Sequence, residues 1–458
     1  MAEPIPQEQA ASPKKVLFLN AFDLFAPSHL SFGQWRNPKD KSSTKAHDLT
    51  YWTTLAQILE RGGYHCLVLS GWPISAMAAV TKNLAFAITG STSYETPYAF
   101  ARRFSTLDHL TKGRIGWNIV TSYNETGARA VGKEIVEHDR RYEIADEFLR
   151  AVYKLWEGSW ADDALVKDAE KDTFADYDRI RFIHHRSENF KFDGPHALSP
   201  SPQRTPFLFQ AGTSGAGIGF ASVHAEGVFV AARSPHILAP SVKEIRRQAA
   251  LAGRDPRSIK VVASITPIIG RTSEEAQAKY QEAQKYASVE SGLAFFSNTS
   301  GIDISQYDLD RELVASDATI DHRVHSLAAA LDYRGDDISR PTPRTIGRFI
   351  AIGGSGATPV GTAEEVADIL EEWADIADLD GFNIGYVTTP GTFEDVVDLL
   401  VPELRKRGRY APKGESTGTL RERVYGNGQA KLRDDHIGHS YRYDNSEIYA
   451  EQDKLPKK

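Results

Sequence analysis

The stretch HCLVLSGWPISAMAAVTKNLAFAITGST, residues 65–92, decides the fold. Residues 65–70 form a continuous apolar run, which is typical of a strand buried on both faces of a parallel sheet. Residues 74–81 predict the start of a helix, and residues 84–92 predict a further buried strand. A strand, a helix and a strand in this order predict a right-handed βα unit of an α/β protein.

The same alternation extends along the chain in both directions. Strand-like runs cover residues 15–22, 65–70, 84–92, 114–122, 207–212, 227–232, 259–270 and 380–387. Helical patterns occupy residues 50–61, 97–111, 138–156, 364–377 and 393–408. Repeated βα units build either a doubly wound sheet or a closed barrel, and eight units favour the barrel. We therefore predict an α/β fold, a TIM (β/α)8 barrel with insertions.

The domain organisation follows from where this alternation stops. The first 14 residues are polar and proline-rich, and we expect a disordered tail there. The barrel then covers residues 15–409, with insertions at about 157–204 and 271–357. The polar extension 410–458 is expected to wrap the surface.

Bulk composition excludes several classes of protein. The chain has 458 residues, a net charge of −7 and no basic block, which argues against nucleic-acid binding. No apolar run approaches the ~20 residues of a membrane span, and the N-terminus lacks the apolar core of a secretory signal. The single cysteine, Cys66, lies in a strand-like run and is interpreted as a buried structural thiol. We expect a cytoplasmic protein.

Functional side chains of a barrel lie at the carboxyl ends of its strands. Here those ends are rich in amide, hydroxyl and glycine, and they show no cluster of histidine and carboxylate typical of a metal site. The chain also lacks a G-x-S-x-G elbow and a P-loop. We predict a site that holds a polar, planar ligand through neutral hydrogen bonds, without metal. A TIM-barrel hydrolase is not supported.

Three local patterns allow two interpretations each. QAGTSGAG, residues 210–217, ends a strand and begins a helix, which suits either a phosphate seat or a plain capped turn. His138 and Tyr142 lie four residues apart on one helix face, so they either reach a ligand or belong to a solvated helix start. Asn118 ends an apolar strand, where a buried structural hydrogen bond is the default interpretation.

Longer segments resemble a known family. SAMAAVTKNLAFAITGSTSYETPYAFARRFSTLDHLTKGRIGWNIVTS (75–122) resembles the bacterial-luciferase-like, flavin-dependent monooxygenases. EHDRRYEIADEFLRAVYKLWEGSWADDALV (137–166), SPSPQRTPFLFQAG (199–212) and DGFNIGYVTTPGTFEDVVDLLVPELRKRG (380–408) continue the match. The resemblance covers roughly residues 15–440. It is strongest to the branch of the long-chain alkane, nitrilotriacetate and dibenzothiophene-sulfone monooxygenases, and within it to the long-chain alkane subgroup.

The resemblance implies a function. Members take reduced FMN from a separate NAD(P)H-dependent flavin reductase and use O2 to oxygenate a small organic substrate, apolar or heteroatom-containing. It implies that FMN contacts come from these residues: Thr89, Ser122, Tyr123, His138, Tyr142, Ala211, Gly212, Thr213 and Ser214. His29 and Tyr123 correspond to catalytic positions beside the substrate. A homodimer or homotetramer is expected.

Two departures from the family pattern affect this expectation. Tyr123 stands where alkane-oxidising relatives carry a histidine. Only Ser70, Gly71, Trp72 and Pro73 stand where relatives have a flavin-binding aspartate and a long loop after the second strand. The shortened loop after the second strand reflects either evolutionary divergence or a gene-prediction error that skipped coding sequence. The alternative function is therefore a catalytically impaired homologue that binds flavin weakly, beside a solvent-open mouth at Gly71.

Overall fold

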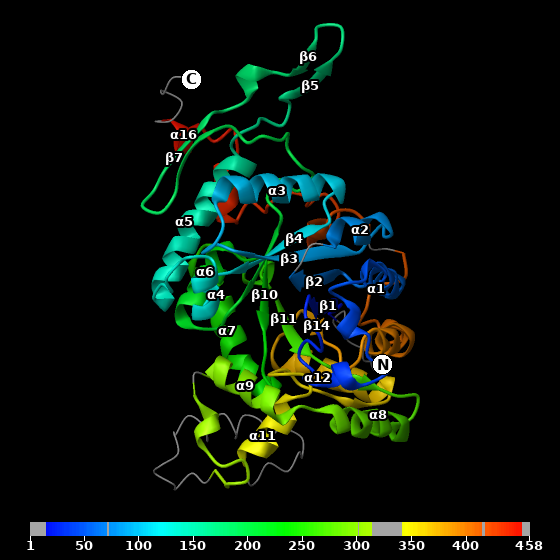
Figure 1. The fold of residues 1–458 in the computed structure, drawn as a ribbon. Helices are drawn as coiled ribbons and strands as arrows, with labels where there is room; N and C mark the ends of the chain where they lie inside the picture. The colour runs from blue at the N-terminus through cyan, green and yellow to red at the C-terminus, as the bar shows by residue number, and fades with distance from the viewer. Residues whose placement is uncertain (1–14, 71–72, 301, 314–340, 415–416, 451–458) are drawn as a thin grey trace, which may run out of the picture.

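The chain forms a closed barrel of parallel strands surrounded by helices (Figure 1). The computed structural model describes residues 15–70, 73–300, 302–313, 341–414 and 417–450. The strand order around the barrel is β1-β14-β11-β10-β9-β4-β3-β2. The bounds are β1 (Phe18–Leu24), β2 (Cys66–Ser70), β3 (Ala85–Ser91), β4 (Ile115–Val120), β9 (Phe207–Ala211), β10 (Gly227–Val230), β11 (Lys260–Ile265) and β14 (Gly381–Ile384).

All eight strand predictions correspond to barrel strands, so the TIM-barrel prediction is confirmed. Several strand boundaries differ by a few residues, and one predicted strand is divided. The run 259–270 is not a single strand, because it divides into β11 and the short β12 (Ile268–Ile269), which pairs outside the barrel with β13 (Val360–Gly361). Registers are regular, as shown by Thr89 opposite Asn118 and Asn20 opposite Asn383.

Helices cover the outside of the barrel. They are α1 (Leu49–Gly62), α2 (Ile74–Ala79), α3 (Pro97–Leu110), α4 (Glu125–Ala130), α5 (His138–Trp156), α6 (Gly215–His224), α7 (Pro235–Leu251), α12 (Ala363–Ile376), α13 (Gly391–Asp395), the π-helical turn η6 (Val396–Leu400) and α14 (Val401–Lys406). Pro97 begins α3, where a missing N–H costs nothing. Among the described residues no helix is long and apolar enough to cross a membrane.

Alternating strand residues divide the core into two parts. Residues facing the helices, such as Leu67, Phe86 and Trp117, belong to the large outer core. Residues facing the lumen, such as Val68, Ala87 and Phe209, form a separate cluster that fills the barrel. Cys66 belongs to the lumen cluster, and burial raises the pKa of its thiol to about 12, as fits an inert structural cysteine.

The two insertions extend from opposite ends of the molecule in Figure 1. The first forms two hairpins, β5 (Leu165–Asp168) with β6 (Thr173–Ala175) and β7 (Ile183–Arg186) with β8 (Lys191–Gly194). The second contains α8 (Ser273–Tyr286), α9 (Val289–Ser300) and α11 (Pro343–Ile350). Single 3-10 turns complete the described structure: η1 (Gln34–Arg36), η2 (Ser42–Thr44), η3 (Tyr177–Arg179), η4 (Pro256–Ser258), η5 (Ile304–Gln306) and η7 (Ile437–Tyr441).

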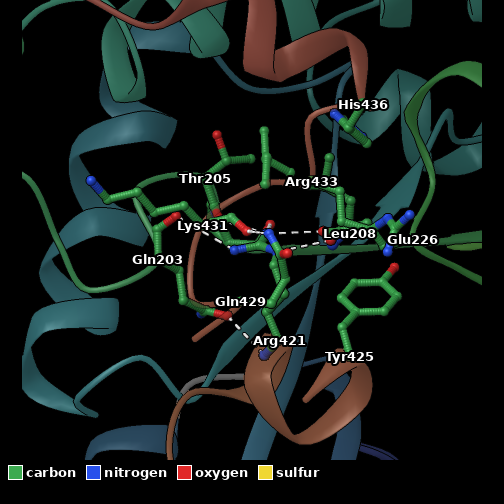
Figure 2. Close-up of polar contacts among 12 residues, drawn as sticks. Gln203, Thr205, Leu208, Glu226, Arg421, Tyr425, Gln429, Lys431, Arg433 and His436 are labelled. Atoms are coloured by element: carbon green, nitrogen blue, oxygen red, sulfur yellow. Dashed lines mark hydrogen bonds and ion pairs between the residues drawn. The ribbon is translucent and has the colours of Figure 1, made fainter. Parts of the chain in front are cut away.

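The C-terminal extension contains α15 (Leu420–Tyr425) and α16 (Ser446–Tyr449), and α15 closes the amino-terminal end of the barrel. Leu420 joins the lumen cluster, and its N–H donates to the carbonyl of Gly113, just before β4. Arg421 is fully buried and pairs with Glu226 at 2.8 Å (Figure 2). The expectation that this extension only wraps the surface was therefore wrong for α15.

The shortened connection after β2 has simple local geometry. β2 ends at Ser70 and α2 begins at Ile74, as expected from the sequence. Gly71 and Trp72, and with them the expected open mouth at Gly71, lie outside the described residues. A pocket of about 340 Å³ adjoins this connection, lined by Phe25, Lys45, Ala46, His47, Asp48, Leu49, Trp52 and Pro73.

Candidate active site

Hydroxyl and amide groups gather at the carboxyl ends of β3 and β4. The Nδ2 of Asn118 donates to the Oγ1 of Thr89 at 3.1 Å, which is the structural hydrogen bond expected for this amide. Ser91 ends β3, and Ser122 lies two residues beyond the end of β4. Their hydroxyls are 2.8 Å apart. Ser122 has a φ of 47°, and its carbonyl accepts from the buried Arg141. These two strand ends therefore present fixed, neutral polar groups.

The next strand, β9, leads into the loop Ala211–Ser214 and the helix α6. The side chain of Ser214 accepts from the N–H of Gly217 at 3.1 Å and so caps the helix. The cap leaves other N–H groups of the first turn without helical partners, and these carry the positive end of the helix dipole. The capped turn and the phosphate seat are therefore compatible features of one loop.

Tyr142 of α5 faces this loop. A Cβ placed on Gly212 or on Gly217 would lie 3.0 Å from the Tyr142 hydroxyl, so the tyrosine meets the loop from the side of the neighbouring helix. His138, one turn earlier, packs edge-on against Tyr142 with ring centroids 5.4 Å apart. His138 is exposed, and its Nδ1 lies 2.6 Å from the carboxylate of Asp139. The structure thus brings together His138, Tyr142 and the loop.

His29 lies on the other side of the barrel mouth, after β1. Its ring is 5% exposed and contacts the rings of Phe22 and Tyr386, at centroid distances of 4.4 and 5.7 Å. Neither ring nitrogen has a hydrogen-bond partner among the described residues. Burial and the charge of Lys45 lower the pKa of His29 to about 3, so the ring is neutral at physiological pH.

Tyr123 differs from the other site residues because its side chain is 60% exposed. Its hydroxyl accepts from the Nδ2 of Asn298 at 3.5 Å. Asn298 belongs to α9, so the second insertion reaches the rim of the site near β4. The assignment of Tyr123 to the reacting centre stays a prediction.

Several buried polar atoms at the barrel mouth have no hydrogen-bond partner among the described residues. The Oδ1 of Asn118, the Oε1 of Gln210 and both nitrogens of His29 are buried without partners among the described residues. Such atoms cost free energy unless a ligand or water satisfies them. They lie from β9 across to β1, on opposite sides of the strand order. This spread leaves buried polar atoms on two sides of the barrel mouth available to a polar ligand.

The sequence did not predict that charged side chains are buried near His29. Asp23, Lys45 and Tyr386 form a buried cluster behind it, and Asp23 directly follows the strand end that the sequence indicated. A carboxylate within an apolar strand was the available signal. Among the described residues there is no group of three or more histidine, cysteine or acidic side chains arranged for a metal ion.

A closed barrel of parallel strands with hydroxyl and amide groups at the carboxyl ends of those strands belongs to the class of TIM barrels, whose functional sites lie at that end. Comparison with known families narrows this class. Residues 29–379 match the luciferase-like monooxygenases, and the chain belongs to that family. The family resemblance derived from the sequence is confirmed.

Individual relatives are similar over nearly the whole chain. The dimethyl-sulfide monooxygenase of Hyphomicrobium sulfonivorans is 40% identical over 94% of both chains. The long-chain alkane monooxygenase of Geobacillus thermodenitrificans is 39% identical over 95% of this chain and all of that one. The crystal structure of DmoA from Hyphomicrobium sulfonivorans superposes with a TM-score of 0.89, at 38% identity over 97% of this chain and 99% of that one.

Proposed function

We propose that this chain uses reduced FMN and O2 to oxygenate a small organic substrate, apolar or heteroatom-containing. The observation that carries the proposal is the seat formed by Tyr142 and the Ala211–Ser214 loop at the start of α6. It suits the phosphate of FMN, because a hydroxyl and a helix N-terminus converge on one point.

The bound flavin would supply the oxygen chemistry, and the protein would bind and orient it. Ser214, Thr213 and Tyr142 would hold the phosphate end, and His138 packs against Tyr142. Thr89, Asn118 and Ser122 would hold the ring system. His29, neutral and buried, would offer one N–H and one lone pair without carrying an acidic proton.

The reduced flavin would come from a separate NAD(P)H-dependent reductase. The chain has no G-x-G-x-x-G placed after a strand, so it lacks the fingerprint of a dinucleotide site. The names of two relatives support this, because each describes one part of a system with several chains: a component of nitrilotriacetate monooxygenase and a subunit of pristinamycin IIA synthase.

Anaerobic titration with reduced FMN tests the proposal. We expect saturable binding by the wild type and weaker binding by Tyr142→Phe. Reductase, NADH and O2 are then added with candidate sulfides, sulfones and alkanes, and oxygenated product is measured against hydrogen peroxide. Weak flavin binding with peroxide as the sole product would favour the impaired homologue, and absence of any binding would refute both functions.

A further inference from the structure

A second pocket lies at the amino-terminal end of the barrel, opposite the strand ends that form the candidate active site. Its volume is about 200 Å³. Its walls come from the end of α1, from the residues directly before β2 and β3, and from residues 410–414 and Arg423 of the C-terminal extension. Reacting groups of a TIM barrel lie at the carboxyl ends of its strands, so the proposed reaction leaves this pocket without a role.

The wall of this pocket carries an excess of positive charge. Among the described residues that line it, one is a carboxylate, Glu60, and the cationic side chains are Arg61, Arg405, Lys413 and Arg423. Arg61 pairs with Asp398 at the surface. No carboxylate of the described residues lies within ion-pair distance of the other three cations, so their charge is available to a ligand.

Glu60 is already engaged by the backbone. Its two oxygens accept from the N–H groups of Lys82, Asn83 and Leu84, at distances of 2.7 to 3.1 Å. These contacts hold the carboxylate against the connection between α2 and β3. They use acceptor capacity that a guanidinium would otherwise take up.

The two arginines of the C-terminal region are held by neutral partners. Arg423 donates to the carbonyls of Asn83 and His65, and Arg405 donates to two other backbone carbonyls at 3.0 and 3.1 Å. A guanidinium has five N–H donors, so each arginine keeps donors for a further acceptor. Because both groups are already oriented, little side-chain freedom is lost when an anion binds them.

Three polar atoms of the wall lack partners, and each can donate. The hydroxyl of Tyr64 and the Nε of Arg423 are buried without a hydrogen-bond partner among the described residues. The Nδ1 of His65 accepts from the N–H of Leu19 at 3.3 Å, so the ring proton resides on Nε2, for which the described residues provide no acceptor. Tyr64 and His65 are only 1% and 6% exposed. Buried donors without acceptors cost free energy, which an acceptor-rich ligand would recover.

We propose that this pocket binds a small oxyanion, a phosphate or a carboxylate, through Arg405, Arg423 and His65. An oxyanion brings only acceptors and negative charge, which complement the donors and cations of the wall. The bound anion joins α1 and the starts of two barrel strands to the C-terminal extension. Its binding therefore stabilises the folded chain.

The test uses the flavin-free full chain, labelled with 15N at histidine and titrated with inorganic phosphate or with succinate at constant ionic strength. His65→Gln identifies the signal of His65. We expect a saturable shift of the His65 Nε2 resonance with at least one anion, and a Tm that rises with the concentration of that anion. The anion that acts distinguishes a phosphate ligand from a carboxylate ligand.

Two variants of the wall should weaken binding to different degrees. Arg423→Gln removes a charged donor and should raise the dissociation constant at least about 10-fold. Lys413→Met removes an exposed charge and should raise it about 1.5- to 5-fold. If Arg423→Gln does not fold, Lys413→Met decides, because the Lys413 side chain is exposed and makes no hydrogen bond among the described residues.

Two controls show where the anion binds. Lys243→Met removes an exposed lysine of α7, outside the pocket, and changes the net charge as Lys413→Met does, so it should leave the affinity unchanged. Tyr142→Phe alters the proposed flavin seat, which also attracts phosphate, and the response of His65 should be the same as in the wild type. The measurement is thus independent of whether FMN binds.

The proposal is overturned if His65 shows no saturable response to either anion, or if Lys413→Met and Lys243→Met bind equally well. Glu415 follows the pocket wall in sequence and lies outside the described residues, so Glu415→Gln is titrated as well. A response of His65 in Glu415→Gln that is absent from the wild type would also overturn the proposal, because the chain's own carboxylate would then be the ligand.

Discussion

The hydroxyl of Tyr142 provides the sharpest test of the flavin site. It faces Gly212 and Gly217 at 3.0 Å from the positions that their Cβ atoms would occupy, and no hydrogen bond to it is found among the described residues. Tyr142→Phe therefore removes a group that contributes little to folding. We expect a change in stability within about 0.5 kcal/mol.

The expected loss of affinity follows from one hydrogen bond to an anion. Such a bond contributes about 1.5–3 kcal/mol, so the dissociation constant for reduced FMN should rise about 10- to 150-fold. Ser214→Ala should differ, because Ser214 also caps α6. It should lose affinity and, in addition, about 0.5–2 kcal/mol of stability.

Both quantities are measured on the same preparations, by anaerobic fluorescence titration with reduced FMN and by urea unfolding. Tyr425→Phe is the matched control, because its hydroxyl donates to the carbonyl of Ser258 at the closed end of the barrel. It should leave FMN affinity unchanged. An unchanged affinity in Tyr142→Phe, or an equal loss in Tyr425→Phe, would refute the assignment of the phosphate seat.

Four further outcomes are expected. Arg421→Met should destabilise the fold by about 3–5 kcal/mol in urea unfolding, because it leaves Glu226 buried without its cation; a loss below about 1 kcal/mol would contradict this. Burial and the charge of Arg423 lower the pKa of His65 to about 3. As pH falls below about 6.5, the unfolded chain gains a proton that the folded chain refuses until about pH 3, so stability falls over that window by up to about 1.4 kcal/mol per pH unit. His65→Gln should flatten the loss, and equal acid sensitivity of both proteins would contradict the assignment. The purified chain should consume no NADH without a reductase, and turnover by the chain alone would show an unrecognised dinucleotide site. Inserting a long-chain alkane monooxygenase loop between Leu69 and Ile74 should raise oxygenated product per reduced FMN, unless the chain as written is already well coupled.

The barrel was predictable because its strands are local signals. Runs such as residues 84–92 are apolar on both faces, and no later part of the chain alters that pattern. The Ala211–Ser214 loop was predictable for the same reason, since its glycines and hydroxyls lie within a few residues.

The cluster around Lys45 could not be read in this way. Its ammonium meets the hydroxyl of Tyr386, 341 residues away, only because β1 and β14 pair when the barrel closes. Arg421 was equally hidden, because an arginine in a polar extension resembles a surface residue until Glu226 is placed beside it. Contacts of this kind depend on topology, which local patterns do not contain.

The closure of the barrel by α15 has a consequence for biosynthesis. The lumen cluster includes residues of β2, β3 and β9, yet Leu420, which completes it, is translated after all eight barrel strands. Until these residues have been added, Leu420 cannot cover the amino-terminal end of the lumen, and incompletely packed apolar surface of this kind favours aggregation. The order of synthesis therefore makes α15 the last element to shield the amino-terminal end of the lumen, after every barrel strand has been made.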